Sequence, residues 1–278
     1  RSRAARLYSF CRYVDDLADK AEDPAVAARD LLKLKRDVLI QGNTSEVSRQ
    51  MVELIGETNM PITPITALID GALQDLEPFK IQDEKDLITY AYHVAGTVGL
   101  MMCPILDVKD RSALPFAIDL GIAMQLTNIA RDVGEDALMG RVYLPADWIG
   151  DLVPANILDP TQTQAETLKR ATKRMLQLAD EYYESGMRGL YYLPRGARWA
   201  ILVAAQVYRE IGTLITRADY QSWDRRAIVS KSRKLRCASL AITAHLLKNR
   251  FRSHFPRHNP IMHRHIPQKF GVDASKVA

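Results

Sequence analysis

Residues Gln125 to Tyr143 read QLTNIARDVGEDALMGRVY, an apolar helical pattern that carries one polar stripe. The stripe consists of Gln125, Asn128, Asp132 and Asp136. If the first dozen residues are helical, these members lie three or four positions apart and share one face over about three turns. Amides and carboxylates inside an otherwise apolar helix cost free energy unless something binds them. The stripe therefore predicts a polar site inside the protein.

A second acidic stripe lies near the N-terminus, in YSFCRYVDDLAD, residues Tyr8 to Asp19. Asp15 and Asp19 are four positions apart, and Asp16 is an additional candidate. On a helix, the oxygens of carboxylates at positions i and i+4 lie about one turn, ~6 Å, apart. Two such pairs that face each other in an apolar cavity need cations to stay ionised. The predicted metal ligands are Asp15, Asp19, Asp132 and Asp136.

Mg²⁺ is the ion that this arrangement predicts, because it binds few carboxylates, keeps water ligands and completes its octahedron with phosphate oxygens. Mn²⁺ is an alternative. Basic residues beside the acidic pairs would neutralise a leaving diphosphate, and Arg12, Arg131 and Arg141 stand at such places. Solvated helix ends are the other interpretation of the acidic segments. The sequence has two acidic pairs, each with polar residues on the same helix face and each within an apolar helix. This arrangement favours the metal–diphosphate site.

The composition is that of an ordinary globular protein, with 278 residues of which 47% are apolar and 26% charged. No apolar run reaches the ~20 residues that span a bilayer. The three cysteines, Cys11, Cys103 and Cys237, are too few and too scattered for a disulfide framework or a zinc site. They are predicted to be buried thiols in a reducing cytoplasm. We therefore expect a cytoplasmic protein.

The chain is predicted to be all-α, a single domain over residues 1–278 with helices around a central apolar cavity. No segment alternates apolar and polar residues with a period of two, so no strand is expected. Helices are predicted at 1–20, 25–40, 44–57, 65–76, 83–106, 112–132, 162–186, 197–218 and 228–252. Small residues at 95–99 predict a groove where another group can lie against the backbone.

Three segments resemble the signature segments of the squalene/phytoene synthase family: YSFCRYVDDLAD (Tyr8–Asp19), YAYHVAGTVG (Tyr90–Gly99) and QLTNIARDVGEDALMGRVYLP (Gln125–Pro145). The third is most similar to bacterial phytoene synthases. The likeness extends over nearly the whole chain, with weaker segments DGALQDLEP (Asp70–Pro78) and AAQVYREI (Ala204–Ile211). The resemblance implies an isoprenoid-synthase-type helical bundle and a prenyl transferase.

The reaction that the resemblance implies is the head-to-head (1'-1) condensation of two geranylgeranyl diphosphate molecules. It would proceed through a cyclopropylcarbinyl diphosphate, prephytoene diphosphate, to phytoene, a step of carotenoid biosynthesis. The reaction would depend on Mg²⁺ and would need no NADPH. Family members usually carry a preceding segment whose Ser/Phe pair helps to hold diphosphate. This sequence does not contain that pair, and activity is expected to depend on it.

The resemblance also implies roles for particular residues. Those that match catalytic positions are Tyr90, Asp15, Asp19, Asp132 and Asp136. Tyr90 would act near the carbocation or in the final proton loss. Those that match substrate-binding positions are Tyr8, Arg12, Gln125, Asn128, Arg131, Arg141, Tyr143, Tyr208 and Arg225. Ala95 and Val98 are predicted to line a tunnel for the prenyl tails.

Two alternative functions stay open at this point. A squalene-, hydroxysqualene- or diapophytoene-type synthase would use farnesyl diphosphate, and the residues at the tunnel floor that set chain length are not located by the sequence. The other alternative is a non-catalytic assembly or scaffold homologue. It is disfavoured because such relatives are expected to lose aspartates from the motifs, and here every motif aspartate is present.

The net charge is +5, and basic residues gather from Arg225 onward. Residues 253–278 are predicted to be a basic, loosely structured tail. One interpretation is contact with the anionic inner membrane surface, which would make the protein peripheral there; the other is a solvated terminal helix. A metal site at His263–His265 is disfavoured for want of further ligands at suitable spacing. No nucleic-acid partner is expected, because no recognition module accompanies the charge.

Overall fold

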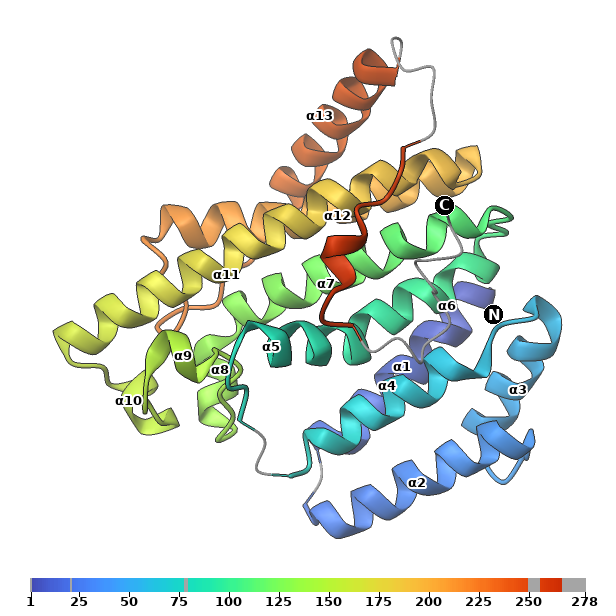
Figure 1. Cartoon of the computed structure of the whole chain (residues 1–278), viewed down its shortest axis with the longest axis horizontal. Helices are drawn as coiled ribbons and strands as arrows, with labels where there is room; N and C mark the ends of the chain where they lie inside the picture. Colours follow the sequence, from blue (N-terminus) through green and yellow to red (C-terminus); the bar gives the residue numbers. More distant parts are fainter. Residues whose placement is uncertain (1, 21, 78–79, 250–255, 267–278) are drawn as a thin grey trace.

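The computed structural model describes residues 2–20, 22–77, 80–249 and 256–266. Throughout these ranges the protein consists of helices without a strand, which confirms the predicted all-α class (Figure 1). The longer helices are α1 (Arg3–Asp19), α2 (Pro24–Ile40), α3 (Glu46–Thr58), α4 (Ile62–Gln74), α5 (Glu84–Ala91), α6 (Thr97–Ile105), α7 (Leu114–Arg131), α11 (Gln162–Arg188), α12 (Arg195–Arg217) and α13 (Lys231–Asn249). The short helices α8 (Val133–Leu138), α9 (Ala146–Ile149) and α10 (Pro154–Leu158) connect α7 to α11.

Helix starts follow the capping residues that the local sequence supplies. The Asp23 side chain accepts a hydrogen bond from the Ala25 amide at 2.8 Å, and Pro24 occupies the first turn of α2. Ser45 caps α3 through a reciprocal pair of hydrogen bonds with Ser48. Because such signals are local, most helix bounds agree with the sequence prediction within a few residues.

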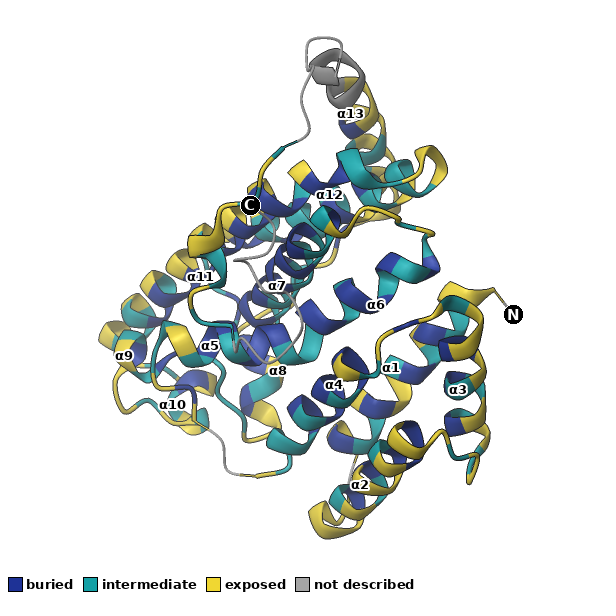
Figure 2. Cartoon of the chain, turned by 45° about the vertical axis from the view of Figure 1, so that its right-hand side comes forward, coloured by how far each residue is buried: buried dark blue, intermediate teal, exposed yellow. Residues whose placement is uncertain are grey.

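Helix α7 runs through the middle of the molecule and packs against α6, α11 and α12 (Figure 1). Most of its side chains are buried, whereas the outer helices carry much of the exposed surface (Figure 2). The helix ends at Arg131. Asp132 follows with a φ of −103° and a ψ of 16°, outside the helical region, and α8 begins at the next residue. The Asp136 amide still donates to the Asp132 carbonyl oxygen at 2.7 Å, so the one-turn spacing of the acidic pair is kept.

The predicted helix over 83–106 is divided by a π-helical segment, Tyr92–Gly96, that lies between α5 and α6. Such segments are frequent at functional sites, and this one follows Tyr90 closely. A Cβ on Gly121 would lie 2.3 Å from the Ala95 carbonyl oxygen, and one on Gly99 would lie 2.1 Å from that of Ala117. The group that lies against the backbone at 95–99 is therefore helix α7 itself.

Buried apolar side chains form two large clusters with a seam between them. The first is built by α1 to α4 with the end of α6, and includes Phe10 and Ile69. The second is built around α7 and α11, and includes Leu126 and Tyr183. Because α1 belongs to the first cluster and α7 and α8 to the second, the two acidic pairs approach the seam from opposite sides.

The stretch Arg111–Arg131 is long and apolar enough to pass as a membrane span by length and composition. However, 61% of its apolar window is buried inside the protein, as in the core helix of a globular fold.

Residues 256–266 lie against the helical body and contain a 3₁₀ turn, Pro260–His263. The Tyr182 hydroxyl donates to the Met262 carbonyl oxygen at 2.9 Å, which joins this segment to α11. The segment thus differs from the loosely structured tail predicted over 253–278. Residues 253–255 and 267–278 of that prediction lie outside the described residues.

Candidate active site

A polar cleft of about 350 Å³ opens at the seam between the two apolar clusters. All the aspartates predicted as metal ligands line it: Asp15, Asp19, Asp132 and Asp136. Other predicted residues in its lining are Arg12, Tyr90, Gln125, Asn128, Arg131, Arg141 and Tyr143. Segments that are far apart in the chain therefore meet in this cleft.

Asp15 and Asp19 reach the cleft from α1. Asp19 Oδ1 accepts a hydrogen bond from Arg141 Nη1 at 2.5 Å, and Arg141 Nη2 donates to the Ala18 carbonyl oxygen at 3.2 Å. Arg141 follows α8, so these contacts join the two sides of the seam. Burial raises the pKa of Asp15 to about 6, and the negative charge of Asp19 adds to this rise. A cation between these carboxylates would favour their ionised form.

Asp16, the additional candidate ligand, is absent from the cleft lining. Its Oδ1 pairs with Arg12 Nη2 at 3.0 Å, and its Oδ2 accepts a hydrogen bond from Lys20 Nζ at 3.0 Å. Two basic side chains already neutralise this carboxylate. The structure does not bring Asp16 together with the other four aspartates.

Asp132 is held by two arginines at the junction of α7 and α8. Arg131 Nε and Nη2 donate to its two oxygens at 2.8 and 2.5 Å. Arg226 Nε lies 3.0 Å from Asp132 Oδ1, and Arg226 Nη1 lies 3.0 Å from Glu135 Oε2. Guanidinium groups recognise phosphate oxygens well, so this side of the cleft is suited to a diphosphate.

Asp136 has the most perturbed carboxyl group of the cleft. Burial raises its pKa to about 8, the charge of Asp132 raises it further, and Arg141 opposes the rise. A carboxyl group in this state keeps its proton at neutral pH unless a cation binds beside it. Strongly perturbed groups inside a cleft are typical of functional sites.

Asp75, which follows α4, also lines the cleft and was missed as a site residue. It accepts hydrogen bonds from the Tyr90 hydroxyl at 3.0 Å and the Tyr143 hydroxyl at 2.8 Å. The two tyrosine rings stack with their centroids 5.0 Å apart. Burial raises the pKa of Asp75 to about 6 and that of Tyr90 well above its ordinary value. The sequence signal for Asp75 was its position in DGALQDLEP, one of the segments with a weaker family resemblance.

Three residues predicted to bind diphosphate lie elsewhere. Tyr8 is 70% exposed and is absent from the lining of the cleft. Arg225 is exposed, and its neighbour Arg226 lies in the cleft in its place. Tyr208 lines an apolar cavity instead of the polar cleft. Arg225 and Arg226 belong to a loop after α12, where no helical period distinguishes neighbouring residues.

This apolar cavity has a volume of about 360 Å³ and adjoins the polar cleft. Both are lined by Asp15, Val94, Gln125 and Asn128. Ala95 and Val98 line the apolar cavity, at the positions predicted for the tunnel. Its volume lies within the ~300–1,000 Å³ usual for small-molecule sites. The joined cavities can hold a molecule with an anionic head and a long apolar tail.

The oxygen donors of the cleft fit a divalent cation. Asn128 Nδ2 donates to Gln125 Oε1 at 3.4 Å, whereas Asn128 Oδ1 is buried and has no hydrogen-bond partner among the described residues. A buried acceptor without a donor is costly and points to a bound group. Together with the carboxylates whose pKa is raised, it forms a set of oxygen ligands of the kind Mg²⁺ prefers.

Comparisons with known proteins show what this chain is similar to. A sequence profile of the squalene/phytoene synthase family matches residues 1–233. The 15-cis-phytoene synthase of Pantoea ananas is 37% identical over 271 residues, which cover 92% of this chain and 87% of the relative. A phytoene synthase of Rhodobacter capsulatus is 37% identical over 242 residues, which cover 84% of this chain and 71% of that protein.

Solved structures of similar fold include a dehydrosqualene synthase in complex with a ligand. It has a TM-score of 0.77 and 30% identity, and the match covers 88% of this chain and 87% of that one. A squalene synthase from Alicyclobacillus acidocaldarius shares the fold with a TM-score of 0.68 at 22% identity, covering 78% of this chain and 83% of that one.

Proposed function

This chain belongs to the squalene/phytoene synthase family, and we propose that it condenses two molecules of geranylgeranyl diphosphate head to head to form phytoene. The observation that carries this proposal is the junction of the two cavities. An aspartate- and arginine-lined cleft opens directly beside an apolar cavity, in a chain 37% identical to bacterial phytoene synthases.

The reaction balances without a reductant. The C1–O bond of one substrate breaks, diphosphate leaves, and the allylic cation is attacked by the C2=C3 double bond of the second substrate. Loss of a proton closes the cyclopropane of prephytoene diphosphate. The second diphosphate then leaves, the skeleton rearranges, and loss of a second proton forms the central double bond. Two substrates yield one phytoene, two diphosphates and two protons, so no NADPH is required.

The charged residues of the cleft act on the leaving diphosphate. The aspartates of α1 and of the α7–α8 junction would hold the divalent ions, and Mg²⁺, when bound, neutralises phosphate oxygens; Mn²⁺ would meet the same donors. Arg131, Arg141 and Arg226 add fixed positive charge along the same lining. Charge aimed at the place where negative charge develops is the largest contribution available to an ionisation.

Tyr90, Tyr143 and Asp75 would act on the positive charge of the substrate. The stacked tyrosine faces can stabilise a cation formed at the mouth of the apolar cavity. Because burial raises the pKa of both tyrosines, their hydroxyls stay neutral at physiological pH. Asp75 accepts hydrogen bonds from both hydroxyls. A proton lost from the cation can therefore pass through the Tyr90 hydroxyl to Asp75.

The apolar cavity would take the prenyl tails. Its walls come from α6, α7, α12 and the 3₁₀ turn Gly189–Tyr192, and include Ala95, Val98 and Leu190. Such walls keep water from quenching the cation before it rearranges. Farnesyl diphosphate is the alternative substrate, because the dehydrosqualene synthase structure is 30% identical over most of both chains.

Product identification tests both substrates. The purified protein is incubated with Mg²⁺ and either geranylgeranyl or farnesyl diphosphate, with and without NADPH, and the hydrocarbons are identified by mass spectrometry. We expect phytoene from the longer substrate, independent of NADPH. A thirty-carbon product from farnesyl diphosphate alone would replace the proposed substrate, and an NADPH-dependent product would replace the proposed reaction.

Membrane contact and cytoplasmic location stay predictions. Substrate and product are lipids, and α13 carries Lys231, Lys234 and Arg236 beside the exposed Leu235. Basic side chains near an apolar one suit the surface of an anionic bilayer. Sedimentation with phosphatidylserine vesicles, at low and high salt, measures this contact.

A further inference from the structure

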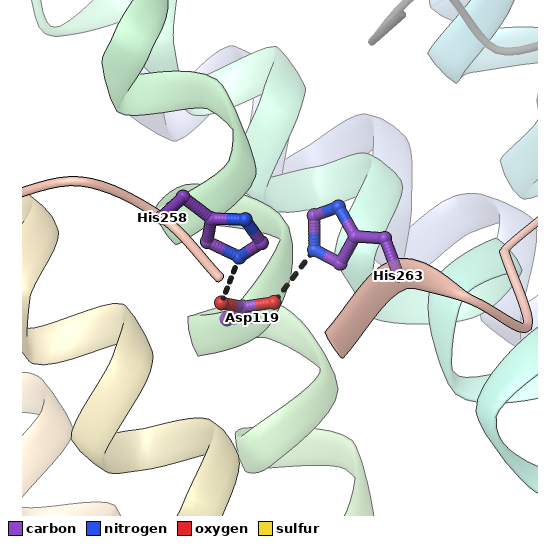
Figure 3. A group of neighbouring side chains, drawn as sticks. All are labelled: Asp119, His258 and His263. Atoms are coloured by element: carbon purple, nitrogen blue, oxygen red, sulfur yellow. Dashed lines mark hydrogen bonds and ion pairs between the residues drawn. The ribbon is translucent and has the colours of Figure 1, made fainter. Parts of the chain in front are cut away.

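A buried cluster outside the active site brings one aspartate together with two histidines (Figure 3). Asp119 lies on α7, while His258 and His263 come from the segment 256–266. His258 Nε2 lies 2.8 Å from Asp119 Oδ2, and His263 Nε2 lies 2.7 Å from Asp119 Oδ1. The Asp119 side chain is fully buried, and the histidine side chains are 10% and 11% exposed.

The segment that supplies both histidines is held in place independently of the cluster. Its backbone carbonyl oxygens at four positions accept hydrogen bonds from side chains of the helical body: from Tyr192 to Pro256 at 2.7 Å, from Arg188 to Arg257 at 2.8 Å, from Tyr182 to Met262 at 2.9 Å and from Thr89 to His265 at 3.0 Å. The two imidazoles are therefore presented to Asp119 by an anchored backbone. A preorganised set of donors is what a binding site requires.

We propose that Asp119, His258 and His263 form a Zn²⁺ site. One ligand atom from each residue lies within 4.8 Å of the others, which allows a single ion to reach all three. Zn²⁺ binds imidazole nitrogen and carboxylate oxygen at about 2.0–2.2 Å, so tetrahedral ligand atoms are about 3.3 Å apart. The distance from an imidazole Nε2 to the Asp119 oxygen that binds the ion would widen by roughly half an ångström, and water would complete the coordination.

The donor set selects zinc over the magnesium of the active site. Two imidazoles and one carboxylate are ligands typical of zinc and its neighbours, whereas Mg²⁺ prefers oxygen ligands and keeps its water. The two oxygens of Asp119 lie within 2.8 Å of the two imidazole nitrogens, so the buried carboxylate is already oriented toward both of the other ligands. Binding through Nε2 would require each imidazole to carry its proton on Nδ1, and it would place a positive ion beside the buried carboxylate.

The zinc site would have a structural role, because it lies behind the wall of the apolar cavity. Phe116 lines that cavity, and its ring meets the His258 ring edge-on with the centroids 5.2 Å apart. An ion shared by Asp119 and the two histidines would fasten residues 256–266 to α7. It would thereby fix the wall against which the prenyl tails are expected to lie.

Direct measurement of metal binding tests the site. The full chain without a polyhistidine tag is titrated with Zn²⁺ against a chromogenic chelator, in excess Mg²⁺ so that the active-site aspartates are occupied. We expect one tightly bound Zn²⁺ per chain. Co²⁺ in place of Zn²⁺ should give the intense visible bands of a four-coordinate site with nitrogen ligands. No stoichiometric binding, or the weak spectrum of an all-oxygen octahedral site, would overturn the proposal.

Matched variants test which residues bind the zinc ion. H258Q and H263Q should each lower zinc affinity about 100-fold or more, because a ligand is lost. H265Q alters a histidine of the same segment outside the cluster and should bind zinc like the wild type. D136N should also keep its zinc, which separates this site from the active-site cleft. Retained affinity in both H258Q and H263Q would overturn the assignment.

Thermal unfolding gives a readout that does not depend on enzyme activity. Zinc at about a hundredfold excess over its Kd should raise the Tm of the wild type and of H265Q by about 5 °C. It should raise the Tm of H258Q and H263Q by about 1 °C or less. If the wild type shows no zinc-dependent shift, the three residues form a hydrogen-bonded contact only and the proposal fails.

Discussion

Asp119 is buried and Asp136 half-buried on the adjoining helices α7 and α8, yet their surroundings shift their pKa values in opposite directions. At Asp119, desolvation is outweighed by two histidine hydrogen bonds, and the pKa is lowered. At Asp136, desolvation and the charge of Asp132 prevail, and the pKa rises to about 8. Burial alone therefore does not decide the charge of a carboxyl group; the donors that converge on it do.

The comparison separates a carboxylate with protein partners from one for which we propose a role in metal binding. Asp119 is satisfied by side chains of the protein itself, from a segment that is far away in sequence. Asp136 lines a cleft that it shares with other carboxylates, and a bound cation would favour its ionised form. Replacing each residue should therefore affect different properties of the protein.

The largest expected effect is on turnover in D136N. Loss of a carboxylate that we propose holds the metal should lower phytoene formation at least about 1,000-fold. The Tm should stay the same or rise, since the amide removes a buried carboxyl that resists ionisation. D151N changes a fully exposed carboxylate and should remain within about twofold of the wild type. Activity in D136N above a tenth of wild type would contradict the proposed role.

Arg226 offers the next largest effect and tests the electrostatics around Asp132. R226Q removes a guanidinium group that contacts Asp132 and Glu135, and should lower kcat/KM about 10- to 100-fold. R225Q, at an exposed position outside the cleft lining, should change it by less than about twofold. The opposite ranking would restore the prediction made from the sequence, in which Arg225 contacts the diphosphate.

D119N should lower stability while leaving chemistry nearly intact. The substituted side chain keeps one oxygen that accepts a hydrogen bond, but an NH₂ group replaces the second oxygen. This NH₂ group is a donor and would face a histidine N–H, which is also a donor. EDTA removes bound metal, so the measurement reports only the loss of hydrogen bonds. Under this condition we expect the Tm to fall by about 5 °C. Turnover well below the Tm should stay within about threefold of the wild type. An unchanged Tm would remove the contrast between the two carboxyl groups.

The last expected effect is the pH dependence of the metal-free protein. Between the ordinary pKa of Asp, near 4, and the raised value of about 8 at Asp136, the folded state holds a proton that the unfolded state releases. Stability should therefore fall as pH rises through this window, and more in the wild type than in D136N. Asp15 and Asp75, each raised to about 6, act in the same direction at lower pH.

Mg²⁺ should reverse this trend, because it binds the ionised carboxylates. Thermal unfolding with and without Mg²⁺ at about pH 5.5 and pH 8 should give a larger Mg²⁺-dependent rise in Tm at the higher pH. A Tm difference between wild type and D136N that does not vary with pH would contradict the raised pKa of Asp136.

The sequence was sufficient to predict the longer helices, the family and four of the five aspartates that line the cleft. Helix α11 was predicted at 162–186 and spans Gln162–Arg188, because its capping residues and apolar period are local. Asp75 and Arg226 were missed for the opposite reason. Their contacts to Tyr143 and Asp132 join segments 68 and 94 residues apart, and no period in the sequence connects such positions.

By itself, the sequence determined that two acidic pairs lie one turn apart on apolar helices, since backbone hydrogen bonding fixes the positions of neighbours along a helix. Only the tertiary structure decided which loop residue enters the cleft, and that Asp119 meets His258 and His263 across 139 and 144 residues. Such meetings depend on how helices pack and where connecting segments return, which are properties of the whole chain and not of any stretch within it.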